Sequence, residues 1–242
     1  MLDVRIARKA YRRNGALHPV LHDIAFTAAP GSVVALFGPS GTGKTTTLRI
    51  VMGLDPDFEG RIGTLPGRLG AMFQEPRLAP WLTVADNLRL VVTESVPPPD
   101  IPALLAEVGL PGAERRLPRE LSLGMARRAA LARALAISPA VLVLDEPFAS
   151  LDPQLAGSLA GVIRARASRT GTAVLLSTHD LDPVFAIADR ILVLSGHPAT
   201  LAADVALPAE ASARQQARAD LLRAFPFLAR ADGEAAATAS PA

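Results

Sequence analysis

The sequence contains no cysteine and no long apolar run. Without cysteine, the chain can form neither a disulfide nor a thiolate metal site. No stretch reaches the roughly 18 consecutive apolar residues that a transmembrane helix needs. The first residues, MLDVRIARKAYRR, also lack the apolar segment of a signal peptide. We therefore expect a soluble, cytoplasmic protein, unless a partner holds it at a membrane.

Lysine is scarce, since the 25 basic residues comprise Lys9, Lys44 and 23 arginines. The basic residues are nearly balanced by 23 acidic ones, which leaves a net charge of +2. So small a net charge gives little reason to expect a nucleic-acid partner, although the isoelectric point is near 9.6. A chain so biased toward arginine is expected to keep a lysine at position 44 because a compact ammonium group is needed there.

Aromatic residues are also few, at 4% of the chain, with a single tyrosine and a single tryptophan. Tyr11 is predicted to end the first strand. An exposed ring at that place could stack on an adenine base, an interaction worth roughly 1–3 kcal/mol. The alternative is an ordinary aromatic residue at a strand end.

The stretch GPSGTGKTT has the pattern of a phosphate-binding loop. It follows a predicted buried strand, Val33–Phe37, and precedes a predicted helix that ends at Gly53. Glycines let the backbone curl so that successive N–H groups face phosphate oxygens, and the helix N-terminus adds its positive dipole end. Lys44 is expected to reach the β- and γ-phosphates, and the Thr45 hydroxyl to ligate Mg²⁺. The predicted nucleotide contacts of this loop are Gly38, Pro39, Ser40, Gly41, Thr42, Gly43, Lys44, Thr45 and Thr46.

Two carboxylates, Asp145 and Glu146, directly follow the uninterrupted apolar run Val141–Leu144. Buried carboxylates are costly unless they meet cations or hydrogen bonds, and open α/β sheets bind their ligands at strand ends. We expect Asp145 to hold the Mg²⁺ bound with the nucleotide, and Glu146 to orient and deprotonate the attacking water. The alternative is a solvated pair of acids in a turn.

His179 follows another predicted strand and could reach the γ-phosphate, although a lone histidine is usually structural or merely exposed.

The order of predicted elements indicates an α/β protein with a mainly parallel sheet flanked by helices. Residues 83–136 are predicted to be mostly helical, so we expect a separate helical lobe at about 76–138. On helix 123–136, Leu131 and Leu135 are expected on the buried face and Arg127 away from it. One nucleotide-binding domain would span residues 1–228, followed by a disordered tail at 229–242. Other predicted elements are two N-terminal strands, a strand ending at Phe73, strands 173–177 and 191–194, and helices 83–92, 101–108, 154–167, 181–188 and 209–224.

Taken together, these motifs resemble the ATP-binding subunit of ABC transporters, over residues from about Leu2 to Leu207. Besides the phosphate loop, the matches in chain order are Tyr11 to the adenine-stacking aromatic, Gln74 to the Q-loop, LSLGM (121–125) to the signature loop, VLVLDEP (141–147) to the second nucleotide motif, Ser150–Asp152 to the D-loop and His179 to the switch histidine.

The resemblance implies a P-loop core with an N-terminal antiparallel β subdomain and the helical lobe. It implies that two copies pack head to tail, so that Ser122, Gly124 and Asp152 of one copy contact the ATP bound to the other. The functional side chains that it implies within one copy are Glu146, His179 and Gln74 for catalysis and Thr45, Gln74 and Asp145 around Mg²⁺.

The resemblance also implies that ATP hydrolysis drives transport through membrane permease subunits at the cytoplasmic face of the inner membrane. A periplasmic or lipoprotein solute-binding protein would be an indirect partner. The segment QEPRLAPWLTVADNL is similar to subunits of the nitrate/sulfonate/taurine importer group, with another small solute as the alternative. The alternative class is a soluble ABC ATPase without a transport role. Such proteins normally carry a long coiled-coil insertion or two fused nucleotide domains, and neither occurs in this sequence.

The signature loop departs from the usual LSGGQ of the family, because Leu123 replaces the first glycine and Met125 the glutamine. Ser122 and Gly124, the expected phosphate contacts, are retained. If the backbone at position 123 needs a positive φ, the leucine is strained by roughly 1–2 kcal/mol.

The segment Pro76–Trp81 is apolar and proline-rich, which suits a preformed groove for a short permease helix. Gln74 lies where the sheet passes into the helical lobe, so it is placed to report the nucleotide state to that lobe. We expect Trp81 to anchor the permease, because buried aromatic side chains tend to dominate interface energies. The alternative is that Trp81 packs between the lobes.

Overall fold

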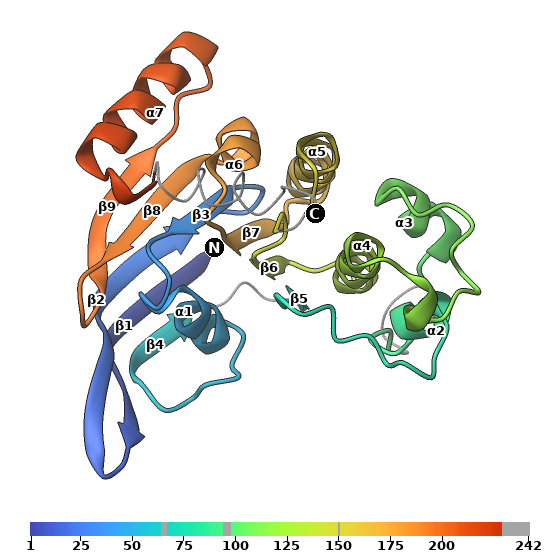
Figure 1. Cartoon of the computed structure of the whole chain (residues 1–242), viewed down its shortest axis with the longest axis horizontal. Coiled ribbons are helices and arrows are strands. Elements are labelled where there is room, and N and C mark those ends of the chain that lie inside the picture. The colour runs from blue at the N-terminus through green and yellow to red at the C-terminus, as the bar shows by residue number, and fades with distance from the viewer. Residues whose placement is uncertain (64–66, 94–97, 150, 229–242) are drawn as a thin grey trace, which may run out of the picture.

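The computed structural model describes residues 1–63, 67–93, 98–149 and 151–228 of the chain. The predicted tail at 229–242 and Ser150 of the D-loop motif lie outside these ranges. The described elements form a layered α/β structure (Figure 1). None of the helices in these ranges has both the length and the apolar character required to cross a membrane.

A six-stranded sheet forms the centre of the molecule, with the strand order β5-β6-β7-β3-β8-β9. Neighbouring strands are parallel, except that β9 pairs antiparallel to β8. Strands β3, β6 and β7 are buried along their whole lengths, as apolar strands covered on both faces should be. Because these three strands run parallel, their carboxyl ends meet at one edge of the sheet. The strands are β3 (Val33–Phe37), β5 (Leu69–Met72), β6 (Val141–Asp145), β7 (Ala173–Ser177), β8 (Arg190–Ser195) and β9 (Thr200–Ala206).

A smaller antiparallel sheet contains β1 (Leu2–Arg13), β2 (Ala16–Ala28) and β4 (Glu59–Gly63) in the order β2-β1-β4. Asn14 and Gly15 have positive φ values of 50° and 78°, which suit the tight turn between β1 and β2. The N-terminal antiparallel subdomain is thus confirmed. The prediction that Tyr11 ends the first strand is wrong, because β1 continues to pair with β2 as far as Arg13.

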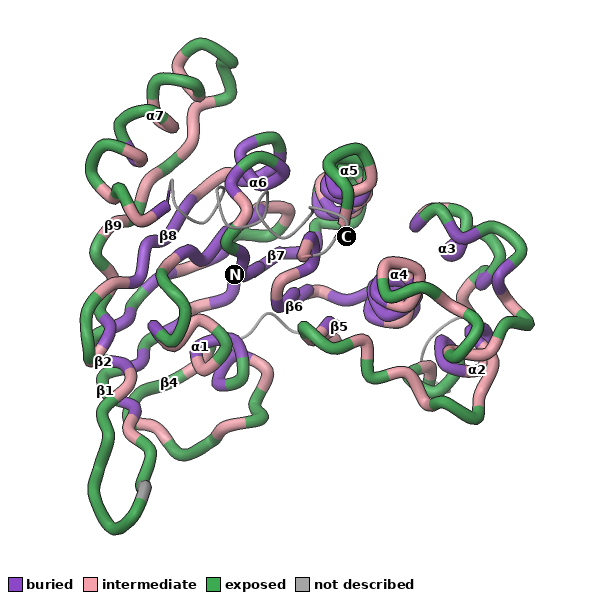
Figure 2. Tube along the Cα trace, viewed as in Figure 1, coloured by how far each residue is buried: buried purple, intermediate pink, exposed green. Residues whose placement is uncertain are grey.

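Alternate residues of β3 pack on opposite faces of the central sheet. Val34 and Leu36 join a buried cluster with α1 (Lys44–Val51) and the smaller sheet. Val33, Ala35 and Phe37 join a second cluster, whose helices include α4 (Leu123–Leu135), α5 (Pro153–Thr170) and α6 (Leu181–Ile187). Figure 2 shows these buried stretches gathered along the central strands. Helix α1, which follows the predicted phosphate loop, therefore packs against both sheets.

Helices α2 (Val84–Arg89), α3 (Ile101–Glu107) and α4 lie together beyond the β5 edge of the central sheet (Figure 1). A 3₁₀ turn, Pro118–Glu120, precedes α4. Helix α7 (Ala211–Ala224) lies at the opposite edge, near β8 and β9 (Figure 1). The position of α2 to α4 agrees with a helical lobe, whose boundaries at about 76 and 138 stay a prediction.

Several predicted element ends differ from the observed ones. The helix predicted to reach Val92 ends at Arg89, since Leu90 and Val91 are exposed and gain no burial by continuing it. The helix predicted to end at 167 continues to Thr170 and stops at Gly171, whose φ is 70°. Strand β9 was not predicted.

Arg127 is only 6% exposed, so its predicted place away from the buried face is wrong. Leu131 and Leu135 are buried, as predicted. Residues 129–132 are all buried as well, which shows that α4 is covered on most of its surface, including the side of Arg127.

Candidate functional site

The predicted phosphate loop connects β3 to α1, which begins at Lys44. Gly38, Gly41 and Gly43 have φ values of 158°, 80° and 89°, a region that favours glycine. A Cβ atom on Gly38 would lie 2.6 Å from the carbonyl oxygen of Leu194. The loop thus needs its glycines, and it leads into the N-terminus of α1, where the first N–H groups of a helix have no partner within the helix and favour anions.

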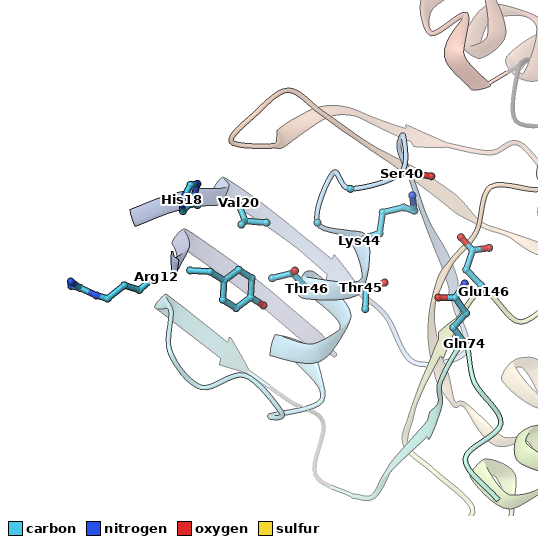
Figure 3. Close-up of a pocket in the computed structure, with 12 residues that line it drawn as sticks. Arg12, His18, Val20, Ser40, Lys44, Thr45, Thr46, Gln74 and Glu146 are labelled. Carbon is cyan, nitrogen blue, oxygen red and sulfur yellow. The ribbon is translucent and has the colours of Figure 1, made fainter. Parts of the chain in front are cut away.

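A cavity of about 750 Å³ lies beside this loop. Lys44 and Thr45 face Gln74 and Glu146 across it, while Arg12 and His18 lie at its far end (Figure 3). A triphosphate on the loop would therefore reach Glu146 and Gln74 with its terminal phosphate. The residues lining the cavity are Tyr11, Arg12, His18, Val20, Ser40, Gly41, Gly43, Lys44, Thr45, Thr46, Gln74 and Glu146.

The Lys44 ammonium group is held on the loop itself. Its Nζ donates to the carbonyl oxygens of Gly38 at 2.6 Å and Pro39 at 3.1 Å. Burial lowers the pKa of Lys44, while the negative charges of Glu146 and Asp145 partly oppose that shift. A polyanion bound in the cavity would compensate for this desolvation, since Lys44 is the cation that the loop directs toward it.

Asp145 ends β6 as a buried carboxylate, only 4% exposed. Its Oδ1 accepts a 2.6 Å hydrogen bond from the Ser177 hydroxyl and lies 3.3 Å from Oγ1 of Thr45. The charge of Lys44 also interacts with that of Asp145, beyond hydrogen-bonding distance.

Thr45, Gln74 and Asp145 together line a smaller cavity of about 160 Å³. Hydroxyl, amide and carboxylate oxygens are the ligands that Mg²⁺ prefers. Arg49 and Arg77 line the same cavity. The described residues hold no cluster of three or more His, Cys, Asp or Glu side chains that would bind a metal on their own. This donor set therefore suits an ion that arrives with phosphates and keeps some of its water.

Glu146 follows Asp145 with a φ of 51°, which is unusual for a residue other than glycine. Its N–H donates to the Ser177 carbonyl at 3.1 Å, and its Oε2 lies 2.8 Å from His179 Nδ1. The hydrogen bond to Glu146 raises the pKa of His179, against the opposing effect of burial. The structure thus brings the predicted base and the predicted switch histidine into direct contact.

Tyr11 lines the larger cavity, with 36% of its surface exposed. Its hydroxyl donates a 2.7 Å hydrogen bond to Oδ2 of Asp55. The ring is thus accessible from the cavity and held at its polar end, which agrees with a stacking role.

Ser122, Gly124 and Asp152 do not line the cavity of their own chain. Ser122 and Asp152 are N-caps, because their side chains accept from the N–H of Met125 at 3.2 Å and of Leu155 at 2.9 Å. Each of these two residues therefore has a structural role, whatever it contacts in a partner.

Leu123 is the first residue of α4 and does not have a positive φ. The condition under which leucine would be strained at this position is therefore not met, because the first turn of a helix accepts any L-residue. The Leu123 side chain is 52% exposed.

Trp81 is 77% exposed, so the alternative that it packs between the lobes is wrong. The preceding segment is fixed by Arg133 of α4, which donates to the carbonyl oxygens of Pro76 at 3.0 Å and Arg77 at 2.7 Å.

The sequence alone did not identify Ser177 as part of the site. Its hydroxyl contacts the Asp145 carboxylate, and both of its oxygens lie within hydrogen-bonding distance of the Glu146 N–H. A hydroxyl at the end of a buried strand was the available signal, but its meaning depends on the pairing of Asp145 with Ser177 across β6 and β7.

Comparison with known proteins places these features in a family. The sequence profile described as ABC transporter matches residues 21–149. The chain is 42% identical over 200 residues to the aliphatic sulfonates import ATP-binding protein SsuB 2 of Pseudomonas syringae pv. tomato, covering 83% of this chain and 84% of that protein. It is 43% identical over 254 residues to the protein of that name from Burkholderia cenocepacia, with 98% and 92% covered.

Solved structures show the same fold. The ATP-binding subunit of an ABC transporter superposes with a TM-score of 0.74 at 25% identity, covering 97% of this chain and 99% of that one. An ATP-binding cassette solved as a dimer in a post-hydrolysis state, with ADP and phosphate bound, superposes with a TM-score of 0.76 at 24% identity, covering 87% of this chain and all of the other.

Proposed function

Since the chain belongs to the ABC transporter family and is the ATP-hydrolysing subunit of an importer, we propose that the cavity beside its phosphate loop is the ATP site. The observation that carries the proposal is that the phosphate loop and Glu146, far apart in the sequence, line the same cavity. The loop N–H groups and Lys44 bind the phosphates, and the Tyr11 ring stacks on adenine.

Thr45, Gln74 and Asp145 would hold Mg²⁺ at the phosphates. The ion, when bound, neutralises charge that develops on the phosphate oxygens. Support comes from the cavity that these three residues share and from the burial of the Asp145 carboxylate.

Glu146 acts as the general base. It accepts a proton from the water that attacks the γ-phosphorus, and the P–O bond to the ADP leaving group breaks. His179 positions the Glu146 carboxylate through their 2.8 Å hydrogen bond and offers a second polar contact to the terminal phosphate. Gln74 lies opposite Lys44 and Thr45 (Figure 3), where it can orient the water.

A second copy of the chain completes the site in this proposal. Ser122, Gly124 and Asp152 of one copy would contact the nucleotide bound to the other. Support comes from the location of these residues away from their own cavity, and from the dimeric cassette that shares the fold.

The partners of this dimer would be permease subunits, which hold it at the cytoplasmic face of the inner membrane, and indirectly a solute-binding protein. We assign aliphatic sulfonates as the cargo, because the relatives at 42% and 43% identity are named as aliphatic sulfonates import proteins. Nucleic acid has no part in this function.

The catalytic assignment is tested by Glu146→Gln, which keeps the shape of the side chain but removes the base. Turnover should fall by roughly 10²–10⁴ while ATP still binds. Calorimetry and an ATPase assay measure the two effects, with Lys44→Ala as the control that should lose binding as well. Hydrolysis at the wild-type rate in Glu146→Gln would show that another group is the base.

The cargo assignment is tested in vesicles that contain the chain, its permease and its solute-binding protein. An aliphatic sulfonate should be taken up at the expense of ATP, and nitrate should not. Uptake of nitrate without uptake of the sulfonate would overturn the cargo assignment but leave the ATPase assignment intact.

A further inference from the structure

The other lysine of the chain, Lys9, contacts Tyr11, the aromatic residue that lines the proposed ATP site. Its side chain is 1% exposed within β1. Nζ donates to Oδ1 of Asp55 at 2.6 Å and to the carbonyl oxygen of Asp57 at 2.5 Å. A buried lysine with a close carboxylate and a carbonyl is satisfied, although its desolvation cost remains.

Asp55 also accepts the hydrogen bond of the Tyr11 hydroxyl, on its other oxygen, Oδ2. Lys9 contacts Tyr11 as well as Asp55, since its Nζ lies 4.4 Å from the centre of the Tyr11 ring, within cation–π distance. Tyr11 is therefore fixed at both its hydroxyl and its ring face. We call Lys9 and Asp55 the tyrosine anchor.

The pKa shifts agree with this arrangement. Burial and the hydrogen bond to Asp55 raise the pKa of Tyr11, so that its phenol stays protonated and donates. Burial alone would raise the pKa of Asp55, but the contacts with Lys9 and Tyr11 lower it overall.

The anchor also links two parts of the proposed site. Asp55 follows the helix that leads from the phosphate loop, while Lys9 and Tyr11 belong to β1 of the smaller sheet. The Tyr11 hydroxyl also interacts with the side chain of Thr46 on the phosphate loop. The position of the ring is therefore set relative to the loop that binds the phosphates.

We infer that Lys9 and Asp55 are positioning residues for base recognition, because they hold the Tyr11 ring at a fixed place above the phosphate loop. This inference rests on the proposed stacking of Tyr11 on adenine. A free tyrosine on a strand surface must lose rotamer freedom when a base binds, and an anchored ring has already lost it. The anchor should thus strengthen binding of the base and leave binding of the phosphates unchanged.

The experiment compares ATP with inorganic tripolyphosphate by calorimetry on the full chain, because tripolyphosphate carries no base. The variants are Tyr11→Phe, which keeps the ring but loses the link to Asp55, Lys9→Met, Asp55→Asn and Tyr11→Ala. Asp3→Asn is the matched control, since Asp3 also pairs with arginines on the smaller sheet, at 3.4 Å from Arg5 and 3.6 Å from Arg61.

The first three variants should weaken ATP binding by roughly two- to tenfold, the effect of an ordinary lost hydrogen bond. Tyr11→Ala should weaken it by roughly five- to one-hundred-fold, the effect of a lost stacking contact. Tripolyphosphate affinity should stay at the wild-type value in all of them. In ATPase assays the KM for ATP should rise while kcat changes little, and Asp3→Asn should match the wild type in every measurement.

Three results would contradict this scheme. If Tyr11→Ala lowers ATP affinity selectively but Tyr11→Phe and Lys9→Met do not, the ring stacks without help and the anchor has no role in recognition. If the anchor variants weaken ATP and tripolyphosphate equally, the anchor supports folding only. If Tyr11→Ala leaves the ratio of the two affinities unchanged, the proposed stacking itself is wrong, and the inference is wrong with it. Tyr11→Phe leaves the Lys9–Asp55 ion pair intact, so the test remains decisive if another variant does not fold.

Discussion

Glu146 combines an unfavourable backbone conformation with two sets of compensating contacts. A φ of 51° costs an L-residue roughly 1–2 kcal/mol. The hydrogen bonds of its N–H to Ser177 and of its carboxylate to His179 offset this cost. Strained residues of this kind cluster at functional sites, because the surrounding structure has to hold them in place. Here the strained residue is Glu146, which lines the cavity and is the proposed base.

The contact between His179 and Glu146 predicts a pH-dependent contribution to stability. The pKa of His179 is raised above its unfolded value of about 6.5, chiefly by the hydrogen bond with Glu146. The stabilisation is therefore fully present below about pH 6.5 and is lost as the pH rises through the higher folded pKa. Because the histidine side chain is 44% exposed, solvent screening keeps the effect small.

The measurement compares melting temperatures of the wild type and His179→Gln without nucleotide across this range. The advantage of the wild type should be largest at acidic pH and should shrink as the pH rises. Groups that do not interact with His179 titrate alike in both proteins and cancel in the difference. Asp180 does not cancel in this way, because burial raises its pKa and the charge of His179 opposes that shift. An advantage that grows with pH would show that the pair is not stabilised by protonation of His179.

At the residue scale, the sequence could predict groups whose chemistry follows from local pattern. The phosphate loop and the Asp145–Glu146 pair are of this kind, because a strand, a turn and the reactive residues are contiguous. Ser177 and Asp55 could not be identified in this way. Their contacts with Asp145 and Tyr11 depend on pairing between strands and on the path of the chain after α1, which no short pattern encodes.

At the scale of single elements, helix starts were predicted better than strand ends. Thr83 and Ser122 are the N-caps of α2 and α4, and a hydroxyl directly before an apolar periodic segment is a local signal of a helix start. Strand β9 was missed, because a half-exposed edge strand of seven residues is stabilised mainly by its pairing with β8.

The α4 N-terminus allows a test that separates capping from contact with a partner. Ser122→Ala removes the cap and should cost about 0.5–2 kcal/mol of stability, whereas Ser122→Asn keeps a capping oxygen and should melt near the wild-type temperature. If the hydroxyl contacts ATP in trans, both variants should lose ATP-induced dimerisation.

Size-exclusion chromatography in the Glu146→Gln background measures that dimer, because ATP is then bound but not hydrolysed. A Ser122→Asn variant that dimerises as strongly as its parent would restrict Ser122 to its capping role.

At the scale of the whole molecule, the fold class could be predicted but the arrangement of its parts could not. Alternating buried strands and helices indicate a parallel sheet. The position of β3 between β7 and β8 cannot be predicted from any single segment of the sequence, because it depends on pairing between distant strands. The burial of Arg127 was mispredicted for the same reason. Helical periodicity reports one buried face, whereas α4 is covered by neighbours that come from distant parts of the chain.

The connection between the sheet and the helical lobe gives the last prediction its basis. The segment from Gln74 to Trp81 leaves the proposed ATP site and enters the lobe, and Arg133 donates hydrogen bonds to two of its backbone carbonyls. A movement of Gln74 with nucleotide state would therefore be passed to a segment that is held in shape. The exposure of Trp81 at the end of this segment leaves a large aromatic side chain without cover in the isolated chain.

We expect Trp81 to be an anchor of the permease interface. With 77% of its surface exposed, it contributes little to the fold, so Trp81→Ala should change the melting temperature and basal ATPase activity only slightly. Co-purification with the co-expressed permease and transport-coupled ATPase activity should be lost, because truncating a buried interface aromatic commonly costs 2 kcal/mol or more, roughly thirtyfold in affinity. Leu17→Ala is the matched control, since Leu17 is 56% exposed but lies on the β1–β2 hairpin, away from the lobe (Figure 1). Normal permease binding by a folded Trp81→Ala variant would place the docking surface elsewhere.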